Sequence, residues 1–286
     1  MRRLPAVLPA LFLATVVMAA DPSAAPQRPK LPVSVAFVLA ADAEVVDFSG
    51  PWGVFEYVSL PGSPGPAYKL FTVAESKRPV KVSGGLTVVP DFSFDTAPRP
   101  DVIVVPALGD KPPPAVLAWL KKVSPRTELI LSVCTGAFVL AEAGLLDGKQ
   151  ATTHHSALNL LAANHPAIDV QRGVRFVDSG RIATAGGLTS GIDLALHVVD
   201  RTFGREVAEA TAAQLEYQGT GWKEPTSNAV FAKPAVSTAE HPLCPVCEME
   251  VDPKRAPALD HEGKHHLFCS ENCRKAFQKS PKSFVR

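Results

Sequence analysis

Apolar, β-branched runs alternate with segments of helical spacing along most of the chain. The runs at 33–40, 68–75 and 101–108 are mostly apolar, as expected for strands that are buried on both faces of a sheet. Helices are predicted between them at 47–60 and 113–123, and the second begins with prolines, which the first turn of a helix tolerates. Strands that alternate with helices predict an α/β layered fold with a mainly parallel sheet.

A strand-to-helix junction follows this pattern. The stretch "ELILSVCTGAFVLAEAGLLDG" predicts a buried strand from Glu128 to Val133, a sharp turn at 134–136 and an Ala/Leu helix that runs to Gly148. Two short strands are then predicted in 174–187, and one or two long helices in 189–217. Ligands of open parallel sheets bind at the carboxyl ends of the strands, and Cys134 lies at such an end.

The composition changes near Gln218. Residues 218–242 are rich in Pro, Ser, Thr, Ala and Gly and show little helical periodicity, so we expect a linker there. Residues 243–286 form a separate small module, and the region before the linker, 31–217, forms the large domain. A chain of 286 residues is long enough for this combination.

Charge and cysteine usage restrict the classes of function. The formal net charge is +1, so no basic field suggests nucleic acid as a partner. Of the five cysteines, Cys134 stands alone, and the other four gather near the C-terminus. This distribution indicates one isolated thiol and one set of four, which differs from a dispersed disulfide framework.

Residues 1–20 have the pattern of a secretory signal peptide. Arg2 and Arg3 precede an apolar run, from Leu4 to Ala20, that ends in small residues. We therefore expect an exported, periplasmic protein; the alternative is an uncleaved anchor, which would be its one contact with a membrane. No later segment approaches the length of a membrane span.

A cysteine at a strand-to-helix turn points its sulfur into the cleft. The helix amino end behind Cys134 favours the thiolate, and neighbouring N–H groups, such as that of Thr135, can stabilise an oxyanion. On position alone, a buried structural cysteine is the favoured interpretation, and a redox thiol is a further alternative.

Three separated motifs favour a reactive Cys134 over a structural one. They are "SVCTGAFVLAEAGLLDGKQATTHH", "DFSGPWGVF" and "ATAGGLTSGIDLALHVVDRTFG". Together they resemble the ThiJ/PfpI superfamily, which has the class I glutamine amidotransferase-like fold, over about 31–217. Within it they look most like the isonitrile hydratase branch and the sensory domains of AraC-type regulators. The resemblance implies a flavodoxin-like sandwich, a homodimer, and a reactive cysteine at position 134 that needs no cofactor.

The same resemblance assigns roles to further residues. Asp47 in "DFSGP" matches an aspartate that faces the thiol, where a carboxyl group can shuttle a proton. The alternative for Asp47 is an N-cap of the following helix. Thr135 and Gly109 match positions that offer oxyanion-binding N–H groups. His154 and His155 are weaker candidates for the lining of the site.

Departures from the family narrow the chemistry. Protease-like members carry His directly after the cysteine, whereas this chain has Thr135, which argues against peptidase activity. AraC-type relatives carry a helix-turn-helix region after the domain, and we find none in this sequence. Transcription regulation is therefore not expected.

The C-terminal module has the ligand spacing of a metal site, with Cys244-x₂-Cys247 followed by Cys269-x₃-Cys273. Such a set can place four thiolates around one tetrahedral ion, and a module this short needs an ion for stability. Thiolates favour zinc or copper. The alternative in an oxidising compartment is two disulfides.

The module resembles the YHS/TRASH type of metal-binding module through "CPVC", "FCS" and the terminal "SPKSF". Glu248 replaces the glycine usual after the second cysteine, which we expect to strain the turn. Met249, His265 and His266 could extend the site for a soft ion.

Two functions remain at this stage. The first is an exported cysteine-dependent hydratase or hydrolase of the isonitrile hydratase kind, which acts on a small-molecule substrate and carries an appended metal-binding module. The second is a non-enzymatic periplasmic protein that binds copper or zinc, or that acts in metal or redox stress. In that case the large domain is a sensor or dimerisation platform, and Cys134 is a redox-sensitive thiol.

Overall fold

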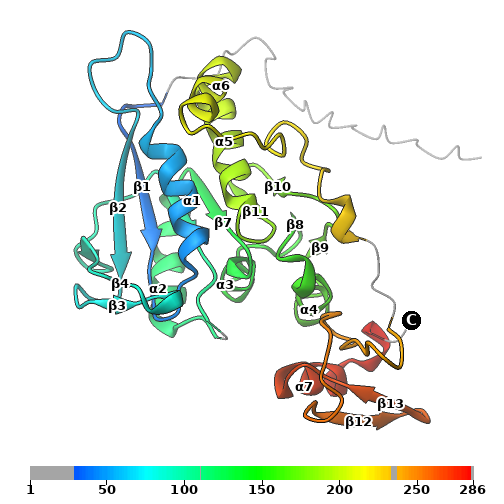
Figure 1. Ribbon diagram of the computed structural model, residues 1–286. Coiled ribbons are helices and arrows are strands. Elements are labelled where there is room, and N and C mark those ends of the chain that lie inside the picture. Colours follow the sequence, from blue (N-terminus) through cyan, green and yellow to red (C-terminus); the bar gives the residue numbers. More distant parts are fainter. Residues whose placement is uncertain (1–28, 110, 233–236, 285–286) are drawn as a thin grey trace, which may run out of the picture.

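A computed structural model describes residues 29–109, 111–232 and 237–284, which comprise an α/β domain and a small cysteine-rich module (Figure 1). The signal peptide predicted at 1–20 lies outside these residues. Among the helices of the described ranges, none is both long and apolar enough to cross a membrane.

A seven-stranded sheet forms the centre of the large domain. Its strand order is β10-β11-β7-β6-β1-β2-β5, and every neighbouring pair is parallel except β10 and β11. The mainly parallel α/β sheet predicted from the sequence is therefore confirmed. The strands are β1 (Val33–Val38), β2 (Tyr68–Ala74), β5 (Phe92–Ser93), β6 (Val102–Val105), β7 (Leu129–Ser132), β10 (Phe176–Asp178) and β11 (Ile182–Ala185).

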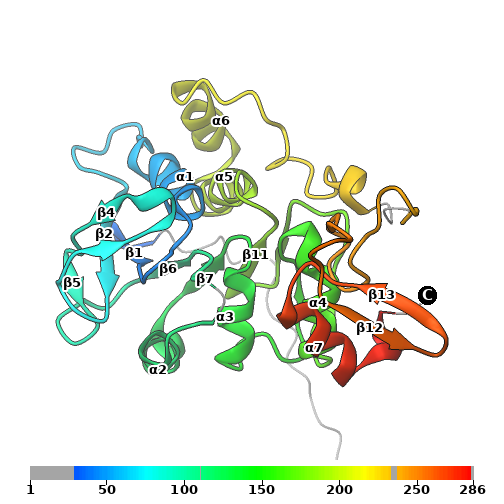
Figure 2. The same ribbon diagram turned by 60° about the horizontal axis from the view of Figure 1, so that its bottom comes forward.

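Helices cover both faces of this sheet (Figure 2). On one face lie α1 (Val45–Glu56), α5 (Ser190–Phe203) and α6 (Arg205–Gln214), and on the other lie α2 (Pro114–Val123) and α3 (Gly136–Glu142). The fourth helix, α4 (Leu158–Asn164), lies beside the small parallel pair β8 (Gln150–Ala151) and β9 (Asp169–Val170). A hairpin around Gly84 and Gly85 consists of β3 (Val80–Lys81) and β4 (Thr87–Val88).

Two helix boundaries differ from the prediction. Helix α1 starts at Val45 because the Ser83 hydroxyl, from the β3–β4 hairpin, accepts a hydrogen bond from the Val45 N–H at 3.0 Å. Helix α3 ends at Glu142, well before Gly148. Gly144 adopts a φ of 74°, and the Leu145 N–H returns to the Leu140 carbonyl, which is the hydrogen-bond pattern of a glycine-terminated helix.

The first part of the predicted linker packs against the large domain. Trp222 is 3 % exposed and belongs to the core of that domain. Arg205 and Lys223 lie over its ring, with cationic centres 5.0 and 4.7 Å from the ring centroid. The core of the large domain therefore extends beyond Tyr217.

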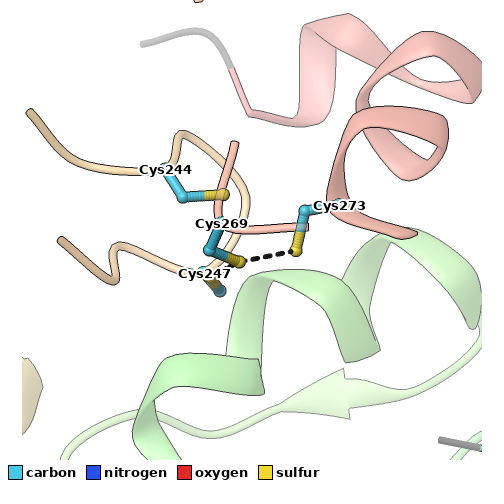
Figure 3. A group of neighbouring side chains, drawn as sticks. All are labelled: Cys244, Cys247, Cys269 and Cys273. Carbon is cyan, nitrogen blue, oxygen red and sulfur yellow. Dashed lines mark hydrogen bonds between the residues drawn. The ribbon is translucent and has the colours of Figure 1, made fainter. Parts of the chain in front are cut away.

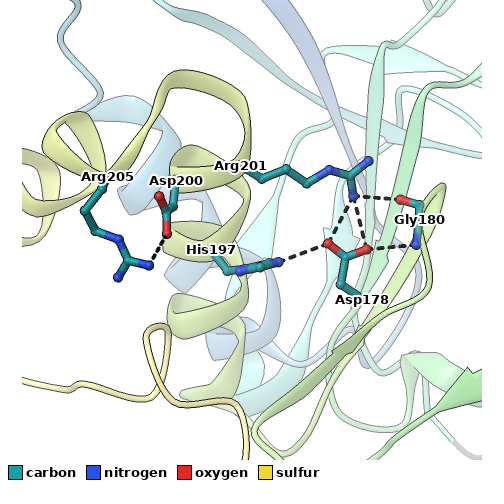
Figure 4. A network of polar contacts seen from close by, with 6 residues as sticks. All are labelled: Asp178, Gly180, His197, Asp200, Arg201 and Arg205. Atoms are coloured by element: carbon teal, nitrogen blue, oxygen red, sulfur yellow. Dashed lines mark hydrogen bonds and ion pairs between the residues drawn. The ribbon is translucent and has the colours of Figure 1, made fainter. Parts of the chain in front are cut away.

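An ion network fastens the antiparallel edge of the sheet to α5 (Figure 4). Asp178, at the end of β10, accepts hydrogen bonds from His197 at 3.0 Å and Arg201 at 3.1 Å, both on α5. Arg201 also donates to the Gly180 carbonyl at 2.7 Å, and Asp200 pairs with Arg205 at 2.7 Å. These contacts position α5 without involving the strand-to-helix junction at Cys134.

The C-terminal module consists of the hairpin β12 (Ala258–His261) and β13 (Lys264–Leu267), which turns at Gly263, and of helix α7 (Glu271–Lys279). Its small core contains three of its cysteines and the rings of Phe268, Phe277 and Phe284, whereas Cys269 is exposed. Leu160 and Ala163 of α4 pack against this core, so α7 lies beside α4 (Figures 1 and 2).

Gly136 supplies the first test of this arrangement. A Cβ atom at this position would lie 2.3 Å from the Val105 carbonyl oxygen, and backbone cannot move aside as a flexible side chain does. Gly136→Ala is therefore expected to lower the free energy of unfolding by about 3 kcal/mol, as measured by urea denaturation.

Gly53 is the matched control, because nothing lies within 4 Å of a Cβ built there, in the middle of α1. Gly53→Ala should raise the free energy of unfolding by about 0.5–1 kcal/mol through helix propensity. Equal effects of the two substitutions would contradict the close approach of α3 to the end of β6.

Candidate functional site

The backbone turns sharply at Cys134, between the end of β7 and the start of α3. Cys134 has a φ of 56°, a left-handed conformation that is strained for a residue with a side chain. Both of its peptide groups are anchored: its N–H donates to the Gly186 carbonyl, and its carbonyl accepts from the Thr153 hydroxyl, each at 2.8 Å. The surrounding structure thus holds the cysteine in a conformation that is typical of functional sites.

The Cys134 side chain is nearly enclosed, since the residue is 9 % exposed. The backbone N–H groups of Thr135 and Leu188 form hydrogen bonds to its sulfur. Two N–H groups that converge on the same point can stabilise negative charge there, on the sulfur or on an atom bound to it.

Asp47 is the acidic group of this site. It is fully buried in the first turn of α1, and its Oδ2 accepts a hydrogen bond from the Ala107 N–H at 3.0 Å. Its Oδ1 is buried without a hydrogen-bond partner among the described residues. The N-cap of α1 is Glu44, so the alternative that Asp47 caps this helix is wrong.

Burial changes the protonation of both groups. Desolvation raises the pKa of Asp47 to about 7, against the lowering effect of the Ala107 hydrogen bond, and the charge of Glu44 raises it further. Desolvation, followed by the charge of Asp47, raises the pKa of Cys134 to about 12, and the Thr135 and Leu188 N–H groups only reduce this shift.

The helix amino end favours the Cys134 thiolate in direction only, because the Thr135 N–H lowers the pKa of the thiol but burial raises it by more. Helix α3 has only seven residues, and the loss of hydration outweighs the two N–H groups at the sulfur. The resting thiol keeps its proton near neutral pH and needs a base to become a nucleophile. Asp47 can serve as that base, because its pKa of about 7 leaves it partly ionised near neutral pH.

Thr135 and Gly109 line one cavity of about 500 Å³. Gly109 follows β6 with a φ of 66°, and Thr135 follows the cysteine. The wall of this cavity also includes Phe138 and Leu160 of the large domain and Cys273 of the module. The residues predicted for catalysis thus lie around the Cys134 junction, and the C-terminal module lies next to them.

The two histidines have different surroundings. The ring of His154 packs against Gly187, where a Cβ atom would lie only 2.4 Å from its Cδ2, and its Nδ1 is 2.9 Å from the Ser156 hydroxyl. Burial, and then the charge of His155, lower the pKa of His154, so this ring is neutral at neutral pH. His155 is exposed and stacks on Phe231, with ring centroids 4.9 Å apart. His154 therefore supports the loop that carries Leu188.

Sequence reasoning missed Leu188 and Glu44. Leu188 lies in "GGLTSG", which the family resemblance places only as a wall of the cleft; its φ of 45° turns its N–H toward the sulfur. The two glycines before Leu188 were the available signal for such a turn. Glu44 affects the site through its charge, and nothing in its sequence context indicates that proximity.

The four C-terminal cysteines converge (Figure 3). Their sulfur atoms all lie within 4.8 Å of one another, with Cys247 and Cys269 at 3.3 Å and Cys269 and Cys273 at 3.5 Å. A tetrahedral ion with bonds of about 2.3 Å to sulfur places its ligands about 3.8 Å apart. All are free thiols in this structure, so the predicted set of four fits a metal ion.

Local structure explains this convergence. The Glu248 N–H donates to the Cys244 carbonyl and the Cys244 N–H to the Met249 carbonyl, each at 2.8 Å, which closes the turn between the first two cysteines. The Ser270 hydroxyl caps α7 by accepting a hydrogen bond from the Cys273 N–H at 3.3 Å.

Glu248 adopts the strained backbone conformation expected where a glycine is usual. Its φ is 62°, and its Oε1 accepts a hydrogen bond from the Asn159 amide of α4 at 3.4 Å. A glycine could not make this contact, so the side chain links the metal-binding turn to the large domain.

Comparisons with known proteins agree with this geometry. The family profile of DJ-1/PfpI matches residues 33–201. The chain is 34 % identical to the isonitrile hydratase of Pseudomonas putida over 189 residues, which are 65 % of this chain and 78 % of that protein. It is 32 % identical to the HTH-type transcriptional regulator CdhR of Pseudomonas aeruginosa over 52 % of this chain, but spans only 45 % of that regulator.

A solved structure gives the same result for the fold. A ThiJ/PfpI family protein from Pseudomonas syringae superimposes with a TM-score of 0.59 and is 29 % identical. The superposition covers 72 % of this chain and 85 % of that one. The part of the chain before the module therefore carries the similarity.

Replacement of Asp47 tests the cost of its burial. Between about pH 4 and pH 7 the folded protein keeps the Asp47 proton while the unfolded chain releases it, so this group lowers stability as the pH rises. Asp47→Asn is therefore expected to raise the free energy of unfolding by about 2–4 kcal/mol at pH 8. The gain should vanish below about pH 4, where Asp47 is protonated in both states.

Urea denaturation at several pH values measures this effect. Asp95→Asn, at an exposed aspartate, is the control and should show no such gain. A loss of stability in Asp47→Asn at pH 8 would contradict the raised pKa.

Proposed function

The chain belongs to the DJ-1/PfpI family, and we propose that it is a cysteine-dependent hydratase that acts on isonitriles or similar electrophilic small molecules. The observation that carries this proposal is the Cys134 thiol in a strained, anchored turn, close enough to the buried Asp47 carboxyl for the charge of Asp47 to raise the pKa of the thiol. Similarity to an isonitrile hydratase supports the choice of substrate.

The first step of this reaction joins the thiol to the substrate. Ionised Asp47 accepts the Cys134 proton as the sulfur bonds to the terminal carbon of R–N≡C. Asp47 then delivers that proton to the same carbon, which gives the thioimidate R–N=CH–S–Cys134. Asp47 thus acts first as a base and then as an acid, and its pKa of about 7 suits both roles.

Water completes the reaction. A water molecule deprotonated by Asp47 adds to the thioimidate carbon, and the nitrogen receives the proton. The N–H groups of Thr135 and Leu188, which bond to the sulfur, hold the negative charge that develops, whereas Gly109 lines the neighbouring cavity. The C–S bond then breaks, the hydroxyl proton returns through Asp47 to the sulfur, and the product is the formamide R–NH–CHO. One water is consumed, and the enzyme is restored.

The C-terminal module adds a metal site to this enzyme. Its cysteine spacing and its resemblance to YHS/TRASH modules support zinc or copper as the ion, held by Cys244, Cys247, Cys269 and Cys273. The ion supplies folding free energy to a core of few apolar residues. The catalytic steps above require only the residues of the large domain.

Export and dimerisation belong to the same proposal. The pattern of residues 1–20 supports secretion to the periplasm, and the family resemblance supports a homodimer. The substrate is then a small molecule that is present outside the cytoplasm.

A second candidate function is a non-enzymatic metal or redox stress protein. The convergence of four thiols supports it, as does the similarity to regulators. However, redox-sensing cysteines are exposed and have low pKa values, whereas Cys134 is buried and its pKa is raised to about 12. The Asp47 carboxyl beside Cys134 provides the base that a buried nucleophile needs, and this favours the enzyme.

Turnover of isonitriles tests the proposal. The kcat/KM for an alkyl isonitrile, followed as formamide release, should rise about tenfold per pH unit below pH 7 and level off above it, because Asp47 must be ionised to accept the thiol proton. Cys134→Ala should abolish turnover, and Asp47→Asn should lower kcat by at least about 100-fold.

The control substitution Asp95→Asn should leave turnover unchanged, since Asp95 is exposed at the end of β5. Full activity of Cys134→Ala would exclude the covalent mechanism. A rate that falls as the pH rises through 7 would exclude Asp47 as the base.

Metal content tests the module. The purified full-length chain should carry one zinc or copper ion, measured by elemental mass spectrometry, and the double variant Cys244→Ser, Cys247→Ser should carry none. Cys134→Ser should keep the ion, because Cys134 lies outside the cluster. A metal-free chain with two disulfides in the module would refute this site.

A further inference from the structure

Helix α7 of the module closes a cavity beside the Cys134 junction. The cavity of about 500 Å³ has Thr135 and Gly109 in its large-domain wall, and Cys273 in its α7 wall. Cys273, a proposed metal ligand, therefore lines the same space as Thr135, whose N–H bonds to the Cys134 sulfur. Cys134 itself is not among the lining residues, so the cavity lies beside the nucleophile and does not contain it.

The lining of this cavity indicates what it could hold. The side that comes from the large domain is mainly apolar, through Leu108, Phe138, Val139 and Leu160, and Ala276 of α7 continues this surface. Lys275 and Lys279, one turn apart on α7, also line the cavity, whereas the acidic lining residue is Glu142 on α3. Because the two lysines outnumber the single glutamate, the cavity favours an anionic group, and its apolar wall favours an apolar body on the same ligand.

Two features of the module hold α7 in this position: the proposed ion at the four cysteines and the packing of the module core against α4. Cys273 lies in the first turn of α7, which Ser270 caps, so an ion bound to the four cysteines fixes the start of the helix. The module core packs against Leu160 and Ala163 of α4, which fixes the helix relative to the large domain. Loss of the ion would therefore loosen one wall of the cavity.

We propose that this cavity is the specificity pocket of the substrate site, and that it takes small molecules with an apolar body and one anionic group. Lys275, Ala276 and Lys279 of the metal-binding module determine this preference. The reactive end of such a molecule extends past Thr135 toward Cys134. This inference rests on the proposed function, because it deepens the description of the same site.

Alkylation of Cys134 tests the pocket without any isonitrile. The zinc-loaded full-length chain is treated with N-phenylmaleimide or with N-(4-carboxyphenyl)maleimide, which share one apolar body and differ in one carboxylate. Peptide mass spectrometry reads the rate at Cys134 alone. The carboxylate reagent should react about three- to tenfold faster, as expected for an attraction by partly exposed charges.

Three variants of α7 separate the effect of the cavity's shape from the effect of its charge. Ala276→Trp fills the cavity and should slow both reagents at least about tenfold, whereas Gln278→Trp, on the exposed face of the same helix, should slow neither. The double variant Lys275→Glu, Lys279→Glu should reverse the preference between the reagents, and Lys264→Glu, on β13, should not. Removal of zinc should reduce the preference toward equal rates.

Unchanged alkylation in Ala276→Trp, or an unchanged preference after the double charge reversal, would overturn the inference. Thermal unfolding of each variant confirms that it is folded. If the alkylation pattern is found but no isonitrile is turned over, the proposed reaction fails and the pocket stands. If isonitriles are turned over but alkylation ignores α7, the pocket alone fails.

Discussion

The burial of the Asp47 carboxyl close to the Cys134 thiol is the constraint on which the rest of the site depends. Removal from water raises the pKa of each group, to about 7 and about 12, so neither is in its usual state of protonation. The strained backbone of Cys134 and the Ala107 N–H hold the two groups in place. Close approach of Gly136 to β6 makes the turn possible. The site thus holds two ionisable groups in unusual protonation states at a cost in stability, as functional sites commonly do.

The cysteine-rich module extends this arrangement. With few apolar residues of its own, it packs against α4, and its four thiols lie close enough together to hold an ion. Glu248 shows that the module depends on the large domain for its position. Its backbone is in a strained conformation, and its side chain accepts a hydrogen bond from Asn159 of the large domain. Because α7 shares a cavity with Thr135, the module is placed to influence what reaches the thiol.

Much of this structure could be predicted from local sequence. Runs such as 33–40 and 101–108 are apolar on both sides of the strand, so they identify a covered parallel sheet, and the spacing of Cys244, Cys247, Cys269 and Cys273 identifies a common site. What could not be predicted depends on contacts between distant segments. Ser83 sets the start of α1 from 38 residues away, and the raised pKa of Cys134 follows from burial, which no local motif encodes.

Trapping of the covalent intermediate tests the central claim that Cys134 is a nucleophile served by Asp47. The full-length chain is mixed with excess isonitrile, quenched in acid during turnover and analysed by intact and peptide mass spectrometry. The account predicts a mass increase equal to that of the isonitrile on the peptide that contains Cys134, and no increase on that peptide in Cys134→Ala. Continued turnover with no adduct at Cys134, or with the adduct on a cysteine of the module, would contradict it.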